Sequence, residues 1–200
     1  MGLAQYDLVD THLAVIDVDG IIYQYVHELA KVAAYVLDRP VERFVSATRW
    51  DFFLDWGLTL EDYLELVEVG VAEYGFLARG EPYANSVEGW RKLREAGVRI
   101  HLATHCPGRS AQEARVAWLT GWGFDYDEID FGEDKSSVAR AGLDAGLVVW
   151  ALEDAPKNYL ALVGAGARCY LRDHPYNQDI LADRVLDVDD FANRVLDGMS

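Results

Sequence analysis

Short runs of apolar residues that end in polar residues are the clearest pattern along the chain. Such runs, bounded by turn residues and too short to be long helices, predict buried β-strands. Nearly continuous apolar strands are typical of a sheet that is covered on both faces. Four runs of this kind span residues 13–20, 98–105, 146–154 and 167–171, and the last is the weakest of them.

Amphipathic helical patterns separate these runs. In residues 86–96, for example, apolar side chains share one helical face, and Gly97 follows as a helix stop signal. Strands that alternate with helices predict βαβ units, and hence an α/β fold with a Rossmann-like parallel sheet. The predicted helices span residues 86–96, 110–120, 136–141, 158–163 and 187–196.

The stretch from residue 21 to residue 79 interrupts this alternation. It is poor in strand patterns and has helical periodicity at 26–37 and 60–74, with an aromatic-rich connection between them. Because the stretch directly follows the first strand, it predicts a small helical cap inserted at that point. We therefore predict a core domain made of residues 1–20 and 80–200, and a cap domain made of residues 21–79.

Polar side chains follow three of the predicted strands where the strands end. They are Asp17 and Asp19, Thr104 and His105, and Glu153 and Asp154. Ligands of open parallel sheets bind outside the carboxyl ends of the strands. Carboxylates that converge there raise one another's pKa unless a cation lies among them. Since Mg²⁺ takes one or two protein carboxylates together with phosphate oxygens, we expect Mg²⁺ at this edge of the sheet.

The charge balance limits the possible partners. Thirty-four acidic residues face eighteen basic ones, which gives a formal net charge of −16, and no run of basic residues occurs. Such a chain is unsuited to wrapping duplex nucleic acid, whose phosphates require a basic face. Anionic membrane surfaces are unfavourable for the same reason. A small phosphorylated substrate stays compatible, because a bound divalent cation reverses the local field.

Length and cysteine content favour a single soluble domain with an addition. The chain has 200 residues and no apolar stretch near the roughly 18 residues of a membrane span. The first residues have neither the basic nor the apolar region of a secretory signal. Cys106 and Cys169 are too few for a disulfide framework and lack metal-ligand spacing. We therefore expect a protein of the reducing cytoplasm.

Four short motifs follow one another, each at a predicted strand end or helix start. They are Asp17-Val-Asp-Gly20, Thr104, Lys135 in Gly-Glu-Asp-Lys-Ser-Ser, and the pair Glu153-Asp154. In this order they resemble the four motifs of the haloacid-dehalogenase-like phosphatases. The resemblance covers the whole chain, and the predicted cap stands at the position of that superfamily's first cap.

This resemblance implies a role for each motif residue. Asp17 would be the nucleophile that takes the phosphoryl group as an aspartyl-phosphate. Asp19 would protonate the leaving oxygen and then activate water. Thr104 would hydrogen-bond the phosphoryl oxygens, and Lys135 would neutralise their developing charge. Asp154 would bind Mg²⁺ together with the Asp17 carboxylate and the Asp19 backbone carbonyl.

Three assignments stay open at this point. Lys157 competes with Lys135 for the third motif, although the helix start favours Lys135. Glu153 stands where many relatives have Asp, and it is either a partner behind the metal ligands or a residue that faces solvent. His105 stands where relatives often have a small residue, and it either contacts the substrate phosphate or packs against its loop.

Three stretches resemble the 5′(3′)-deoxyribonucleotidases of that superfamily more specifically. They are Trp50-Asp-Phe-Phe, Ala151-Leu-Glu-Asp-Ala-Pro-Lys-Asn158 and His174-Pro-Tyr-Asn177. Because cap aromatics of that family pack against the nucleobase, the resemblance implies Trp50, Phe52 and Phe53 as base contacts. Arg109 is either a phosphate or sugar contact or a solvated loop residue. The implied reaction is Mg²⁺-dependent hydrolysis of (deoxy)nucleoside monophosphates to nucleoside and phosphate.

Three alternative functions remain. A polynucleotide 3′-phosphatase is disfavoured by the acidic chain. A phosphatase for sugar phosphates or another small metabolite is the second alternative, because cap aromatics do not prove that the substrate carries a base. A non-catalytic binding module is disfavoured because Asp17, Asp19 and Lys135 are all present. A homodimer is a further possibility if Trp118 or Trp122 lies at the surface.

Overall fold

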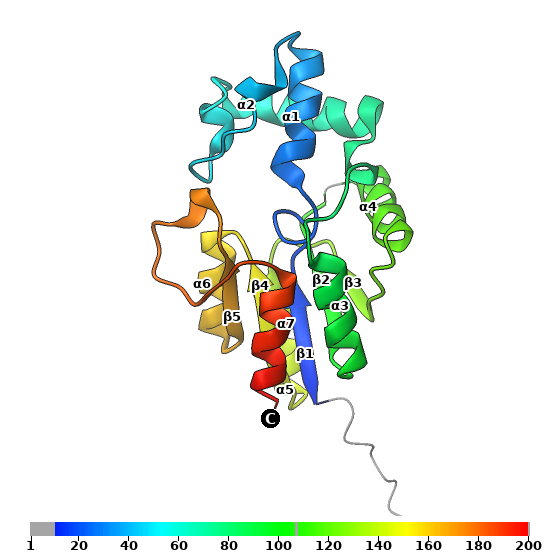
Figure 1. The fold of residues 1–200 in the computed structure, drawn as a ribbon, viewed down its shortest axis with the longest axis vertical. Helices are drawn as coiled ribbons and strands as arrows, with labels where there is room; N and C mark the ends of the chain where they lie inside the picture. The colour runs from blue at the N-terminus through cyan, green and yellow to red at the C-terminus, as the bar shows by residue number, and fades with distance from the viewer. Residues whose placement is uncertain (1–10, 107, 200) are drawn as a thin grey trace, which may run out of the picture.

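The computed structural model describes residues 11–106 and 108–199, so the first ten residues of the predicted core domain lie outside the described part. Six parallel strands form one sheet in the order β3-β2-β1-β4-β5-β6 (Figure 1). The predicted α/β class with a parallel sheet is confirmed. The strands are β1 (His12–Ile16), β2 (Arg99–Ala103), β3 (Glu128–Asp130), β4 (Val148–Glu153), β5 (Arg168–Arg172) and β6 (Arg184–Val185).

Two of these strands, β3 and β6, are absent from the sequence prediction. β3 places one apolar residue between two acids, and β6 has only two residues. Both strands lie at an edge of the sheet, where a strand has one neighbour and little of it is buried. An apolar run is therefore not required there, so the hydrophobic pattern carries no signal.

Two helical layers cover the sheet. Alternate residues of β1 point to opposite faces, as the pleat of a strand requires. Leu13 packs with residues of α5 and α6, whereas Ile16 belongs to the core cluster that contains residues of α3, α4 and α7. In Figure 1, α3 and α7 lie side by side in front of the strands. These helices are α3 (Ser86–Glu95), α4 (Arg109–Gly121), α5 (Lys135–Asp144), α6 (Pro156–Ala165) and α7 (Val188–Asp197).

The segment between β1 and α3 forms a helical cap over the carboxyl end of the sheet (Figure 1). Its main helices are α1 (Tyr25–Val36) and α2 (Leu60–Val69). Thr59 and Asp62 begin α2 with a reciprocal capping box, since the Thr59 hydroxyl accepts from the Asp62 amide and the Asp62 carboxylate accepts from the Thr59 amide. The predicted helical insertion after the first strand is thus confirmed, whereas its boundaries at residues 21 and 79 remain a prediction.

Trp118 and both cysteines lie inside the protein. Trp118 is only 3% exposed and packs against Tyr23 and Phe124, so it is not available at the surface for a dimer contact. Trp118 lies on the face of α4 that packs into the main hydrophobic core, and that packing explains its burial. Cys106 and Cys169 are free and buried. Among the described residues, every helix is too short or too polar to cross a bilayer.

Candidate active site

The register of the sheet brings three chain segments together. Ile16, the last residue of β1, lies beside Leu102 of β2 and Leu152 of β4. The residues that follow these positions therefore emerge at the same edge, beneath the cap. Asp17 comes from the first segment and Glu153 from the third, and Lys135 reaches the same place from the first turn of α5.

Lys135 is the centre of this cluster. Its Nζ lies 2.8 Å from Asp17 Oδ2 and 2.8 Å from Glu153 Oε2, and all three side chains are buried. Burial alone would lower the pKa of Lys135, but the two carboxylates outweigh burial and raise it. Lys135 is therefore protonated, and it links the Asp17 carboxylate to the Glu153 carboxylate.

Glu153 is fully engaged by the protein. Burial alone would raise its pKa, but Lys135 outweighs burial, so the pKa is lowered. Its Oε1 accepts hydrogen bonds from the backbone amides of Asp154 and Ala155, at 3.2 and 3.1 Å. Because Oε2 is bonded to Lys135, both oxygens have partners. Glu153 thus anchors Lys135 and shapes the loop after β4, and it does not face solvent.

Asp154 completes an acidic group. Ligand atoms of Asp17, Glu153 and Asp154 all lie within 4.8 Å of one another. Burial, with the carboxylates of Glu153 and Asp17, raises the pKa of Asp154 well above its usual value. Burial and Glu153 also raise the pKa of Asp17 to about 8. The cluster is therefore short of positive charge, which is what a hard divalent cation would provide.

The loop after β1 is held tightly against this group. Gly20 has a φ of +76°, and a Cβ there would fall 1.8 Å from Asp154 Oδ2. Only glycine fits that position. Arg172 donates to the carbonyls of Gly20 and Ile21 at 2.7 Å each, and a ring nitrogen of His174 lies 2.7 Å from the Gly20 carbonyl. These contacts orient Asp19 and its backbone.

Asp19 has a partner that sequence reasoning did not find. Arg115 of α4 is fully buried, and its Nη2 donates to Asp19 Oδ1. Its guanidinium lies 3.9 Å from the ring centroid of Tyr23, which is itself buried in the core. Burial raises the pKa of Asp19, against the opposing effect of Arg115. The sequence signal was only an arginine among apolar residues of a helix.

Thr104 and His105 follow β2 at the same edge. The Thr104 hydroxyl is buried and has no hydrogen-bond partner among the described residues. Such an orphaned polar group is rare and is satisfied if it receives a ligand oxygen. His105 is exposed and lines the pocket above the acidic group.

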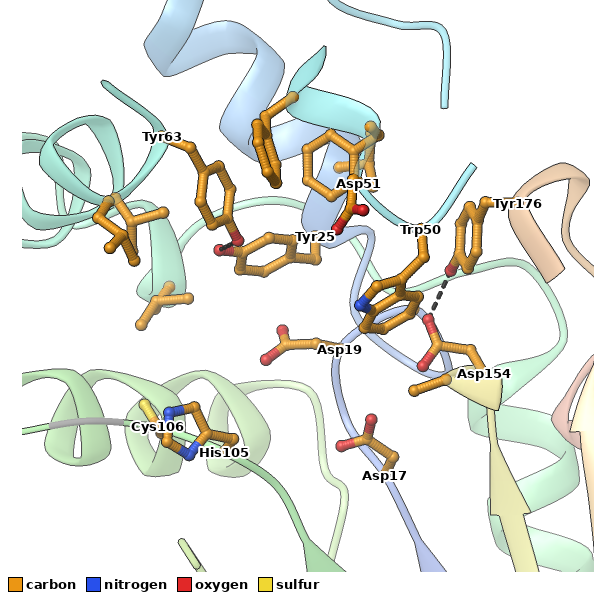
Figure 2. Close-up of a pocket in the computed structure, with 18 of the residues that line it drawn as sticks. Asp17, Asp19, Tyr25, Trp50, Asp51, Tyr63, His105, Cys106, Asp154 and Tyr176 are labelled. Atoms are coloured by element: carbon orange, nitrogen blue, oxygen red, sulfur yellow. Dashed lines mark hydrogen bonds between the residues drawn. The ribbon is translucent and has the colours of Figure 1, made fainter. Parts of the chain in front are cut away.

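A pocket of about 450 Å³ lies between the core and the cap. Its floor contains Asp17, Asp19, Lys135 and Asp154. Figure 2 shows the three carboxylates below Trp50 and below the hydrogen-bonded hydroxyls of Tyr25 and Tyr63. The pocket size suits a small organic molecule.

The three predicted cap aromatics all line this pocket. Trp50 is 51% exposed, and its ring meets the Tyr176 ring edge-on at 5.8 Å, so it bridges cap and core. Phe53 is buried and stacks on Tyr63 at 5.0 Å, whereas Phe52 packs against Trp56. Phe52 and Phe53 therefore combine cap packing with pocket lining.

Two basic residues of the sequence analysis lie away from the cluster. Arg109 is outside the lining of this pocket, and its exposed guanidinium pairs with Glu113 at 2.8 Å. This i,i+4 pair on the surface of α4 accounts for its orientation, and the pocket lining does not support the predicted substrate contact. Lys157 is exposed on α6 and is also absent from the lining.

Tyr176 was not singled out as a site residue. Its hydroxyl donates to Asp154 Oδ2, and its ring stacks on His174. Asn177 donates to the backbone carbonyls of Asp154 and Arg172, at 2.9 and 2.8 Å. The stretch containing these residues was noted only for a family resemblance. Its position against Asp154 follows from the course of the chain after β5.

Of the comparisons with known proteins, only the one with solved structures finds a match. No family model matches the chain, and no curated protein matches it.

Solved structures match nearly the whole chain. A predicted phosphoglycolate phosphatase from Haemophilus somnus has a TM-score of 0.64 at 17% identity, covering 92% of this chain and 97% of its own. A haloacid dehalogenase-like hydrolase from Streptococcus pneumoniae has a TM-score of 0.62 at 12% identity, covering 95% and 99%. The β-phosphoglucomutase of Clostridium difficile has a TM-score of 0.57 at 17% identity, covering 94% and 96%.

These likenesses agree with the haloacid-dehalogenase-like part of the sequence prediction, and they do not bear out its deoxyribonucleotidase part. The identities are too low to transfer an activity, but each structural match extends over nearly the full length of both chains. The protein therefore has the core-and-cap fold of the haloacid dehalogenase-like hydrolases.

Proposed function

We propose that the protein is a metal-dependent phosphomonoesterase that hydrolyses small phosphorylated metabolites. One observation carries this proposal: Lys135 is held between Asp17 and Glu153, at 2.8 Å from each, on the floor of a pocket that the cap covers. A buried carboxylate beside a fixed ammonium group is arranged to attack an electron-poor centre while the cation meets the charge on its oxygens.

The residues on the floor fit a divalent cation such as Mg²⁺. Three carboxylates (Asp17, Asp19, Asp154) line the floor with Lys135, while Glu153 and Arg115 lie outside the lining as partners of Lys135 and Asp19. The Asp17 and Asp154 carboxylates, with the Asp19 backbone carbonyl, would hold the ion. No described residue donates a hydrogen bond to that carbonyl. When bound, Mg²⁺ supplies charge stabilisation to the phosphoryl oxygens and orients the phosphate.

The chain's own residues would carry out two transfers. In the first, an Asp17 carboxylate oxygen forms a bond to phosphorus while the bond to the ester oxygen breaks, and Asp19 gives that oxygen a proton. In the second, water attacks phosphorus, gives a proton to Asp19 and frees Asp17. Asp19 Oδ1 is bonded to Arg115, which leaves Oδ2 for the proton. Thr104 would donate to a phosphoryl oxygen.

A nucleoside monophosphate is a second candidate substrate. The observation in its favour is the aromatic lining, since Trp50, Phe52 and Phe53 all face the pocket. Stacking of a base on an aromatic side chain is worth roughly 1–3 kcal/mol. The acidic chain argues against the polynucleotide 3′-phosphatase alternative, since a strand requires a basic approach.

Removal of divalent cations is expected to abolish phosphate release. Without a cation, the acidic cluster opposes the approach of an anionic phosphate, so we expect a loss of at least about a hundredfold. The test measures phosphate from 5′- and 3′-mononucleotides, sugar phosphates, p-nitrophenyl phosphate and a 3′-phosphorylated oligonucleotide, with Mg²⁺ and with EDTA. Added Mg²⁺ should restore the rate. Turnover that persists in EDTA would contradict the metal-dependent reaction.

Arg115 gives a separate prediction as a positioning residue. Arg115→Met removes the partner of Asp19 Oδ1, so proton donation to the leaving oxygen becomes less effective. General acid catalysis contributes about 10²–10⁴-fold, and it matters most for poor leaving groups. The variant is expected to lose at least about tenfold more kcat with an alkyl phosphate than with p-nitrophenyl phosphate.

The control for this prediction is Arg140→Met, which removes an exposed pair with Asp134. Arg115→Lys keeps a cation near Asp19 and should recover part of the alkyl phosphate rate. Equal losses with both esters would show that Arg115 serves only the fold.

A further inference from the structure

The pocket has two chemically different ends. The core end carries the acidic floor with Lys135 and His105. The cap end is formed mainly by apolar side chains of α1, α2 and the turns that follow. They include Val26, Phe53, Leu64, Val67, Val71 and Phe76. With the phosphate on the floor, the alcohol part of a phosphomonoester occupies the cap end, so the cap side chains meet the leaving group.

The cap end offers little to a polar leaving group. Its two phenol groups, of Tyr25 and Tyr63, are bonded to each other at 3.0 Å. Burial raises the pKa of both phenols, so both are uncharged. Asp51 is the one charged side chain that the cap segment contributes to the described lining, and it is negative. A carboxylate or a second phosphate on the leaving group would meet no cation there and would face Asp51.

Apolar side chains are left uncovered at the mouth of this end. Leu60 and Leu64 are each 57% exposed, and Trp50 is 51% exposed, yet all three line the pocket. The two leucines are four residues apart on α2 and therefore share one face of the helix. Exposed apolar side chains that line a pocket mark a place where an apolar group is covered on binding.

We propose that the substrate is a phosphate monoester of an uncharged, predominantly apolar alcohol, aromatic or branched aliphatic. This inference rests on the proposed phosphatase function. The cavity of about 450 Å³ is large enough for a leaving group of ring size or more above the phosphate. Burial of apolar surface then supplies the binding free energy at the cap end. Anionic or polyhydroxylated leaving groups have little apolar surface to bury and would lose their hydration there.

The test compares kcat/KM for 2-phenylethyl phosphate, phosphoglycolate, glucose 6-phosphate and thymidine monophosphate with Mg²⁺. All four are esters of poor leaving groups, so the cap contacts dominate the differences. We expect 2-phenylethyl phosphate to exceed the phosphoglycolate and glucose 6-phosphate values by at least about thirtyfold. A higher value for glucose 6-phosphate, phosphoglycolate or the nucleotide would overturn the inference.

A variant tests the same point from the side of the protein. Leu64→Lys places a cation at the cap end on a side chain that is 57% exposed, so the fold should tolerate it. The ratio of phosphoglycolate to 2-phenylethyl phosphate turnover is expected to rise at least about tenfold. The matched control is Leu160→Lys, since Leu160 is 56% exposed on α6 and lies outside the pocket. An unchanged ratio in the Leu64 variant would contradict the inference.

p-Nitrophenyl phosphate distinguishes failure of the phosphatase function from failure of the apolar leaving-group preference. Its leaving group departs readily, so Mg²⁺-dependent turnover that Asp17→Asn abolishes would support the phosphatase function whatever the cap prefers. If the enzyme hydrolyses p-nitrophenyl phosphate in this way but prefers polar esters, only the inference of an apolar leaving group is overturned. No phosphate release from any ester, p-nitrophenyl phosphate included, would overturn both.

Discussion

Replacement of Asp17 by asparagine is expected to lower kcat at least about a thousandfold, or about 4 kcal/mol in transition-state stabilisation. The asparagine side chain has the shape of aspartate, but its amide is too weak a nucleophile to form the bond to phosphorus. Asp17 Oδ1 accepts from the Val18 amide at 2.7 Å, a contact that the asparagine oxygen can keep. The amide nitrogen then replaces Oδ2 beside Lys135, so the variant also loses some stability, and the rate is measured well below its unfolding midpoint. Initial rates with p-nitrophenyl phosphate and Mg²⁺ measure the loss in kcat.

Two further variants make this result specific. Asp144→Asn removes an exposed acid at the end of α5 and should leave the rate unchanged. Asp19→Asn should slow the release of the phosphoryl group from Asp17, so mass spectrometry of the quenched variant is expected to detect phosphate bound to Asp17. Wild-type rates in Asp17→Asn would exclude Asp17 as the nucleophile.

Replacement of Lys135 by methionine is expected to have the second large effect, on both stability and activity. The variant leaves Asp17 and Glu153 buried without the ammonium group that lies 2.8 Å from each. Loss of one partner of a buried ion pair costs about 3–5 kcal/mol, because the remaining charge stays buried. Urea unfolding should report this loss as a lower midpoint. Phosphatase activity should fall as well, since the cation facing the phosphoryl oxygens is gone.

Lys157→Met is the matched control. Lys157 is the other lysine near Asp154 in the sequence, but it is exposed and outside the pocket lining. Its replacement should change the free energy of unfolding by less than about 0.5 kcal/mol, as is usual for surface positions. A similar unfolding midpoint for the two variants would mean that the buried cluster does not depend on Lys135.

The central sheet and its helices were largely predictable because their signals are local. A strand buried on both faces needs a run of apolar residues, and each of the four predicted runs overlaps a strand of the structure. The long helices were found from their apolar faces. The predicted helix at 60–74 shows the limit of the method: the α-helix ends at Val69 and a π-helical turn follows over Gly70–Tyr74. That change depends on packing in the cap rather than on periodicity.

The sequence by itself determined which chemistry-bearing residues gather at one edge of the sheet. Asp17 and Glu153 end two strands that are neighbours in space, and the carboxyl ends of parallel strands lie together whatever the connecting segments do. The predicted helix start at residue 136 likewise favoured Lys135 over Lys157, and α5 does begin at Lys135. For these residues a local pattern is enough, because backbone geometry carries the side chain to the site.

Only the tertiary structure decided which polar side chains contact one another. Arg115 is 96 residues from Asp19, and Tyr176 is 22 residues from Asp154, so neither contact has a local signal. Tyr25 and Tyr63 meet only because α1 and α2 contact each other in the cap. Side-chain partners depend on how distant elements pack, and a pattern of apolar positions specifies which faces are buried but not which polar groups meet there.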